Sequence, residues 1–375
     1  MLSLHGVASG FNGVAHGDQT TSQEARAMSV GLTPDQLDDF VQLTLKKFHR
    51  NKWTDISLPF QKYVASRFME KQKVNERGGE QISWRVQVKN SGLARNTGMF
   101  ATDVTGVEDV MISANVPWAM QTVNYSYDID EPEFQSDRET IIRILKVREH
   151  DAMNSMAELN EENLWSAPTS SADKRPMGIP FWLQKDATTN VNGGFEGGNP
   201  AGFSGGSGGI DSDAYPRWRN WTFGYTDVTV DDLVKKVKKA LTFTHFMPPV
   251  QHPSLQQGSS DYEILTTYRV QEPLERLAET RNDNLGKDVA RYMNQVTIGG
   301  VPLSWVPYLE NNDTSDPLYG INWSVFRPFA KTGCQMRRSK PKVSPSQHNV
   351  RTVHIDNWCN YMCVDRRACW VGSKS

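Results

Sequence analysis

Ser204 is the serine whose surroundings match a pattern typical of a nucleophile. It is the central residue of Gly202-Phe203-Ser204-Gly205-Gly206, which fits the Gly-x-Ser-x-Gly elbow of serine hydrolases. In that elbow, an apolar strand before the serine and a helix after it hold the hydroxyl in a strained turn. Both flanks here consist of glycine, asparagine and serine, which predicts a flexible surface loop instead. A hydrolase that uses Ser204 is therefore kept only as an alternative.

The cysteines near the C-terminal end are the candidate metal ligands. Cys359, Cys363 and Cys369 are separated by even numbers of residues, which predicts that their thiols share one face of a strand. His348 and His354 lie nearby in the sequence, so a zinc protein is a second alternative. However, the sequence lacks the Cys-x-x-Cys pairs typical of structural zinc sites. We expect reduced thiols that pack as small hydrophobic side chains.

Other signatures of chemistry are missing from the sequence. It contains no phosphate-binding loop, no dinucleotide-binding glycine fingerprint and no metalloprotease helix motif. The acidic residues are scattered, so no pair can be assigned as general acid and base. The densest basic run is a candidate nucleic-acid-facing surface and comprises Arg337, Arg338, Lys340 and Lys342. We therefore expect no catalysis, no cofactor and no bound metal.

Length and composition indicate a folded chain with one large or two interleaved domains. Of the 375 residues, 38% are hydrophobic, and 11 Trp, 11 Tyr and 15 Phe suffice for a substantial core. The formal net charge of -2 does not create the strong positive field of a protein that grips nucleic acid. No signal peptide and no membrane-spanning stretch are visible, so we expect synthesis in a cytoplasm and no membrane partner.

The first third of the chain predicts an arm, a helix and a hairpin. About thirty residues rich in Gly, Ser, Thr and Gln predict an extended arm, and the capping pattern at Thr33 predicts a helix over 33–50. Polar and apolar residues alternate from Ile82 to Lys89, which predicts a strand with one covered face. A second strand-like stretch runs from Val107 to Tyr127. Because an isolated hairpin is marginally stable in water, we expect this one to lie on another subunit.

The rest of the chain mixes helices with mostly antiparallel strands. Helical periodicity from Glu133 to Trp165 predicts one helix of roughly 45 Å. After a glycine-rich tract at 192–209, Thr229 caps a second amphipathic helix. A strand at 263–266, a hairpin around Gly299-Gly300 and long strands over 350–371 follow. These patterns predict an α+β fold.

Several segments carry a family resemblance. They are Trp165-Ser166-Ala167-Pro168, Met177-Gly178-Ile179-Pro180-Phe181-Trp182-Leu183, Tyr215-Pro216-Arg217-Trp218-Arg219-Asn220-Trp221, Leu318-Tyr319-Gly320-Ile321-Asn322-Trp323 and Gln347-His348-Asn349-Val350-Arg351. Together with the order of the elements from Thr33 onward, they resemble the major capsid proteins of tailed bacteriophages, which share the Hong Kong 97-type fold.

The resemblance implies an N-terminal arm, an extended β-hairpin loop, a long spine helix, and peripheral and axial domains. The arm and first helix would occupy 1–50. The peripheral domain would occupy 51–190, with the extended loop at 78–115 and the spine helix at 133–165. Residues 191–335 would form the axial domain, and the strands of 336–375 would return to the peripheral domain. The residues expected to contact neighbouring subunits are Trp84, Arg85, Lys89, Arg95 and Phe100.

The implied function is that of a major capsid protein made in a bacterial host. It would assemble as pentamers and hexamers into an icosahedral head around double-stranded DNA, with portal, scaffold and cement proteins as further partners. The stretch before Thr33 is short for a scaffolding domain, so we expect no proteolytic removal of such a segment. The nearest alternative is an encapsulin-like compartment shell of the same fold, and a decoration or adaptor protein of a virion is another.

Overall fold

The computed structural model describes most of the chain beyond residue 56. The described residues are 57–71, 73–100, 102, 106, 108–130, 138–186, 191–246, 249–250, 261–279 and 296–375. They fall into two compact units, of which one contains 126–130, 138–149 and 340–352 and the other contains the remainder. The predicted arm and the predicted helix at 33–50 lie outside the described residues.

The long helix predicted from the 3.6-residue period is α5 (Arg138–Leu164). Its end at Leu164 falls one residue before the predicted end, and Ala152 and Met156 are buried at the expected spacing. Helix α3 (Val64–Lys71) buries Val64 and Phe68. Shorter helical segments are α6 (Ile179–Trp182), η1 (Pro216–Trp218), α10 (Pro307–Asn312) and η3 (Arg366–Ala368). None of the helices described is long and apolar enough to cross a bilayer.

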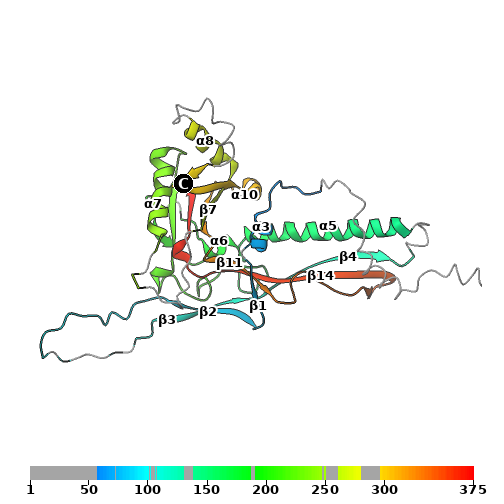
Figure 1. Cartoon of the computed structure of the whole chain (residues 1–375), viewed down its shortest axis with the longest axis horizontal. Coiled ribbons are helices and arrows are strands. Elements are labelled where there is room, and N and C mark those ends of the chain that lie inside the picture. The colour runs from blue at the N-terminus through cyan, green and yellow to red at the C-terminus, as the bar shows by residue number, and fades with distance from the viewer. Residues whose placement is uncertain are drawn as a thin grey trace, which may run out of the picture. The chain divides into compact units, whose positions relative to one another are not determined.

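A mixed sheet of seven described strands contributes buried side chains to both hydrophobic clusters of the core (Figure 1). In spatial order its strands are β5 (Gly194–Gly197), β6 (Asn220–Tyr225), β15 (Trp370–Lys374), β10 (Leu318–Asn322), β7 (Tyr262–Thr266), β9 (Val301–Trp305) and β8 (Thr297–Ile298). Every residue of β6, β7 and β10 is buried, because the sheet is covered on both faces.

Two helices accompany this sheet. Helix α7 (Lys235–Thr244) continues from a π-helical turn, η2 (Val230–Val234), and packs Val237 and Ala240 against the sheet. As predicted, Thr229 caps this segment, since its hydroxyl accepts a hydrogen bond from the Asp232 backbone amide. Helix α8 (Tyr268–Glu279) follows β7 and buries Val270 and Leu274.

A second sheet, of six strands within the described residues, is organised around the long strand β14 (Gln347–Cys363). The other members are β1 (Val74–Glu76), β11 (Phe326–Lys331), β12 (Arg337–Arg338), β13 (Lys342–Ser344) and β4 (Ala119–Asp128). Within the segment 336–375, β12, β13 and β14 join this sheet, whereas β15 joins the seven-stranded sheet between β6 and β10. The domain bounds expected from the resemblance stay a prediction.

The stretch from Val107 to Tyr127, predicted as one strand of the hairpin, is two strands. β3 (Met111–Pro117) pairs with β2 (Gln81–Gln87), and β4 then pairs with β14 in the six-stranded sheet. The ladder ends at Pro117, which has no amide hydrogen to donate. At the break, the Trp118 indole N–H donates to the Gly79 carbonyl over 3.1 Å and so fixes the point at which the chain leaves the hairpin.

Candidate intersubunit surface

The β2–β3 ribbon has one face on its own chain and one face in solvent. Its alternation is the predicted one: Ile82, Ala114 and Val116 are buried in the main hydrophobic cluster, whereas the residues between them are exposed. Trp84 shares the inward face, and its ring lies 6.1 Å from that of Trp182. The base of the hairpin is therefore held by packing within the chain.

The glycine-rich tract beneath the hairpin is a folded support, which corrects the expectation of a flexible surface loop. Its Gly208 carbonyl accepts a hydrogen bond from the Asn115 amide over 2.9 Å, and its Ser207 carbonyl accepts one from the Trp218 indole over 3.1 Å. Gly208 has a φ of +69°, and a Cβ there would lie 3.3 Å from the Trp182 ring. A side chain at this position would therefore strain the backbone and crowd the Trp182 ring on which the hairpin packs.

Beyond the ribbon, several described residues of the connection from Val88 to Val110 make polar contacts with one another. The last backbone pair is Val88 N–H to Val110 carbonyl, at 3.1 Å. Lys89 Nζ and Glu108 Oε2 lie 2.8 Å apart, and this hydrogen-bonded carboxylate raises the pKa of Lys89 above its ordinary value. Arg95 donates to the Thr102 carbonyl over 2.8 Å. Figure 1 shows the connection running away from the seven-stranded sheet.

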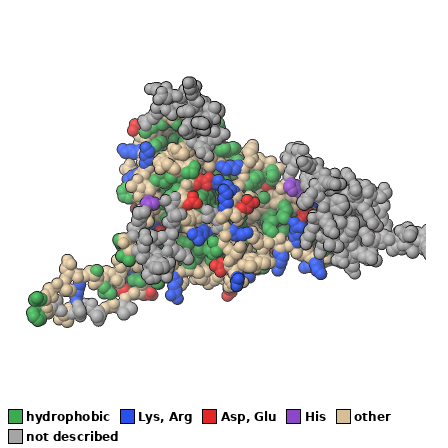
Figure 2. All heavy atoms as spheres, viewed as in Figure 1, with side chains coloured by type: hydrophobic (Ala, Val, Ile, Leu, Met, Phe, Trp, Pro, Cys, Tyr) green, Lys and Arg blue, Asp and Glu red, His purple; other side chains and the backbone are tan. Residues whose placement is uncertain are grey.

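The far end of this connection presents large apolar side chains to solvent. Met99 is 93% exposed and Phe100 is 101% exposed, and Leu93 is 46% exposed. Phe100 also has a φ of +65°, a left-handed conformation that is costly for a bulky residue. Figure 2 shows hydrophobic side chains at this end of the hairpin loop. An exposed aromatic residue in a left-handed conformation is a candidate for a binding role, which stays a prediction here.

The five residues predicted to contact neighbouring subunits do not all lie in the same part of the hairpin. Phe100, Arg95 and Lys89 belong to the exposed connection, and Arg85 lies on the outward face of the ribbon. Trp84 is half-buried against its own chain. Their contacts with neighbouring subunits stay a prediction.

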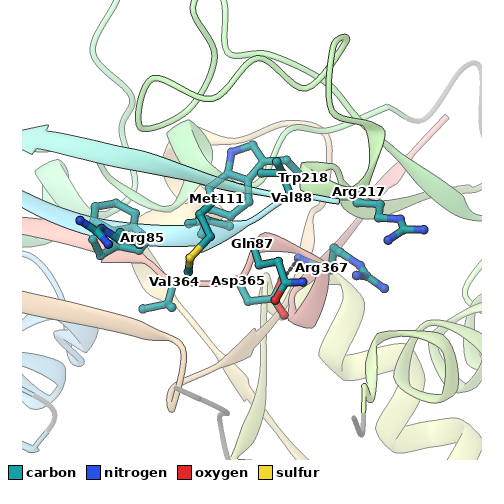
Figure 3. Close-up of a pocket in the computed structure, with 11 residues that line it drawn as sticks. Arg85, Gln87, Val88, Met111, Arg217, Trp218, Val364, Asp365 and Arg367 are labelled. Atoms are coloured by element: carbon teal, nitrogen blue, oxygen red, sulfur yellow. Dashed lines mark hydrogen bonds between the residues drawn. The ribbon is translucent and has the colours of Figure 1, made fainter. Parts of the chain in front are cut away.

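At the base of the hairpin the ribbon borders a surface pocket of about 370 Å³. Three arginines line it: Arg85 from β2, Arg217 from η1 and Arg367 from η3. Figure 3 shows Arg217 and Arg367 on one side of the pocket and Arg85 on the other. Only Arg85 was singled out from the sequence. The other two could not be joined to it, because they belong to segments far from it in the chain.

The basic run is exposed and is divided between the two compact units. Arg337 Nη2 lies 3.6 Å from Asp356 Oδ2, its neighbour across β12 and β14. Because Arg337 and Arg338 are consecutive in a strand, their side chains leave opposite faces of the sheet. Lys340 and Lys342 are also exposed and belong to the other compact unit. Contact between these residues and nucleic acid stays a prediction.

The sites of the enzymatic alternatives lack the expected geometry. Ser204 is exposed in a run of turns, without the strand before it and the helix after it that a nucleophile elbow needs. Cys359 and Cys363 are buried on β14, whereas Cys369 follows η3, so the three thiols do not share one strand. Burial raises the pKa of Cys359 to about 12. Within the described ranges no group of three or more His, Cys, Asp or Glu side chains could hold a metal ion.

Comparison with known proteins identifies the fold. No protein-family model and no curated protein sequence matches the chain. Among solved structures, the capsid asymmetric unit of cyanophage A-1(L) is similar with a TM-score of 0.57 and 14% sequence identity. This likeness covers 88% of the present chain and 98% of the cyanophage chain. The capsid of the myovirus phage XM1 gives a TM-score of 0.50 at 9% identity, covering 89% and 98% of the respective chains. The chain has the α+β fold of phage capsid proteins, as predicted.

Proposed function

We propose that this chain is a major capsid protein, which assembles as pentamers and hexamers into the icosahedral head of a bacteriophage. The observation that carries the proposal is the extent of the fold likeness, which takes in 98% of the cyanophage capsid chain. A likeness confined to one domain would leave room for another role. Here the hairpin, the long helix and both sheets belong to a fold that is known from capsids.

The exposed end of the hairpin supports self-association. Phe100 and Met99 together place two large apolar side chains in solvent, where a soluble monomer gains nothing from them. An interface with a second copy would remove both from water. Residues 78–115 would then be the extended loop of the subunit, and α5 its spine helix.

Packaged double-stranded DNA is the proposed content of the shell, with portal, scaffold and cement proteins as further partners. The near-neutral net charge of -2 suits a shell that encloses nucleic acid without gripping it. Arg337, Arg338, Lys340 and Lys342 are the candidates for the surface that faces the DNA. The protein would reside in the virion after synthesis in the host cytoplasm.

The test is assembly of the full chain expressed in bacteria, followed by size exclusion and negative-stain electron microscopy. The proposal predicts closed shells, or rings of five and six that close as the concentration rises. A variant lacking residues 90–106 should stay folded and soluble but form no closed shells. A chain that remains monomeric at high concentration, with or without the other head proteins of its genome, would overturn the proposal. Shells isolated with a cargo enzyme instead of DNA would favour the encapsulin-like alternative.

A further inference from the structure

We propose that the three-arginine pocket at the hairpin base binds a carboxylate side chain of a neighbouring copy of this chain. The pocket is defined by Arg85, Arg217 and Arg367. The inference rests on the proposed shell function, because it requires a second copy next to the hairpin. It adds a polar contact at the base of the hairpin to the apolar contact expected at its end.

The surrounding chain balances only part of the positive charge in the pocket. Among the described residues, neither Arg85 nor Arg217 has a hydrogen bond or an ion pair, although both lie at the same pocket. Arg367 stacks over the Phe246 ring at 3.7 Å and over Phe195 at 5.9 Å. Its pKa is lowered chiefly by burial; the Asp365 carboxylate raises the pKa, and the nearby Arg217 lowers it. Three arginines thus line one hollow, Arg217 and Arg367 on one side and Arg85 on the other (Figure 3).

Asp365 is the acidic residue that lines this pocket. Its carboxylate already accepts the backbone N–H of Arg367 over 3.0 Å, as the cap of η3. One carboxylate leaves the pocket with two excess positive charges, in a chain whose overall net charge is -2. Excess positive charge in a pocket favours the binding of an anion.

The walls of the pocket favour an amino-acid side chain over a phosphate. Trp218 and Val364 line it from the chain's core, and Met111, 47% exposed, lines it from β3. An acidic side chain has an apolar stem for such walls and a planar carboxylate that matches the fork of arginine. A DNA phosphate has no apolar stem and makes its contacts on open basic surfaces.

The position of the pocket on the hairpin favours a second copy of the chain as the source of the carboxylate side chain. Arg85 and Met111 are both on the ribbon whose connection ends in the exposed Met99 and Phe100. If a neighbour covers that end, the same neighbour passes along the outward face of the ribbon and reaches the pocket. The chain carries 43 Asp and Glu residues, so it can supply the carboxylate.

Carbodiimide coupling tests the proposal directly, because it joins an amine to a carboxylate in contact with it. The variant Arg217→Lys places an amine in the pocket, and shells are assembled from equal amounts of unlabelled and ¹⁵N-labelled chains of this variant. After coupling and digestion, mass spectrometry should find the lysine at position 217 joined to an Asp or Glu peptide. Pairs that combine a labelled with an unlabelled peptide show that the link joins two copies.

Arg219→Lys is the matched control, two residues away on the same segment. Arg219 pairs within its own chain, at 2.9 Å to both Glu196 and Asp213. Its coupled peptides should therefore be purely labelled or purely unlabelled. As a second readout, the double variant Arg85→Gln and Arg217→Gln should assemble only at several-fold higher concentration, or at lower salt, than the parent chain.

The outcomes separate the two proposals. If the parent chain forms no assemblies, the proposed function fails and this inference with it. If shells form but position 217 couples only within one chain, couples to nothing, or carries an attached nucleotide, the pocket does not bind a neighbour's carboxylate. In that case the proposed function stands.

Discussion

Replacing Arg366 with methionine should destabilise the subunit severely, although the residue lies outside every candidate binding surface. Arg366 is fully buried and has no carboxylate partner among the described residues. Its guanidinium donates instead to neutral acceptors on the segments that surround η3. These are the Trp182 carbonyl at 2.7 Å, Ser212 Oγ at 2.9 Å, the Gly198 carbonyl at 3.0 Å, Asn220 Oδ1 at 3.0 Å and the Gly197 carbonyl at 3.4 Å. Burial lowers the pKa of Arg366 to about 10, which still leaves the side chain charged at neutral pH.

The magnitude follows from what remains after the substitution. Methionine fills a similar volume and removes the cost of burying a charge, which offsets part of the loss. However, the Trp182 and Gly198 carbonyls and Ser212 Oγ lose this donor, and each unsatisfied buried group costs about 1–3 kcal/mol. Asn220 Oδ1 keeps a second donor, because it also accepts the Gln184 backbone N–H over 3.1 Å. The Ser212 hydroxyl can rotate, which recovers part of the loss. We expect a net loss of about 3–5 kcal/mol in the free energy of unfolding, a large part of the stability of a typical domain.

The assay is urea unfolding of unassembled subunits, monitored through the fluorescence of the tryptophans around η3. Arg366→Lys keeps the charge but lacks the planar fork, so it should lose most of the same stability. Arg276→Met is the control, because Arg276 is 75% exposed and pairs only with Glu272 one helical turn away. Its midpoint should barely move. A loss below about 1 kcal/mol for Arg366→Met would refute the reasoning that neutral acceptors around a buried cation depend on it.

Three further predictions follow from single side chains. Burial raises the pKa of Glu161 above its ordinary value, so the folded subunit binds this proton more tightly than the unfolded chain. Ionisation of Glu161 should therefore reduce the stability of the subunit as the pH rises from about 4.5 through the folded pKa. The melting temperatures of the parent and of Glu161→Gln should converge at low pH. The half-buried Cys334 should react with a thiol reagent in the folded subunit, whereas Cys359, with its pKa raised to about 12, should react only after denaturation, as counted by mass spectrometry. Phe100→Asp should raise the concentration needed for assembly, measured by light scattering, about tenfold or more without shifting the melting temperature in calorimetry. The control Val250→Asp, at a residue that is 76% exposed and not part of the hairpin segment, should change neither quantity.

Features fixed by local chemistry could be predicted from the sequence. The period of α5, the Thr229 cap and the alternation of β2 depend on residues within a few positions of one another. The hairpin at Gly299-Gly300 is another example, because both glycines have a positive φ, as the tight turn between β8 and β9 requires. In each case the residues that determine the structure are neighbours in the chain.

Features fixed by partners distant in the sequence could not be predicted. The departure of β4 from the hairpin depends on its pairing with β14, more than two hundred residues later. The glycine-rich tract resembles a flexible loop until Trp182 and the hairpin are known to pack on it. The three-arginine pocket has the same origin: Arg85 was a candidate through its strand, but Arg217 and Arg367 reach it only through the fold.

The energetics of the hairpin explain why a firmly anchored base and an exposed end suit assembly. Full burial of Met99 and Phe100 would contribute about 1.5–3 kcal/mol each. Ordering each side chain would cost about 0.5–1.5 kcal/mol, so one hairpin end contributes at most about 5 kcal/mol and typically about half of that. Alone the typical value corresponds to millimolar binding or weaker, so a misplaced subunit can dissociate and be replaced. A carboxylate in the three-arginine pocket would strengthen the same contact only when the ribbon lies in register on its neighbour. Correctly placed subunits would then dissociate more slowly than misplaced ones, because only they form the contacts at both the end and the base of the hairpin.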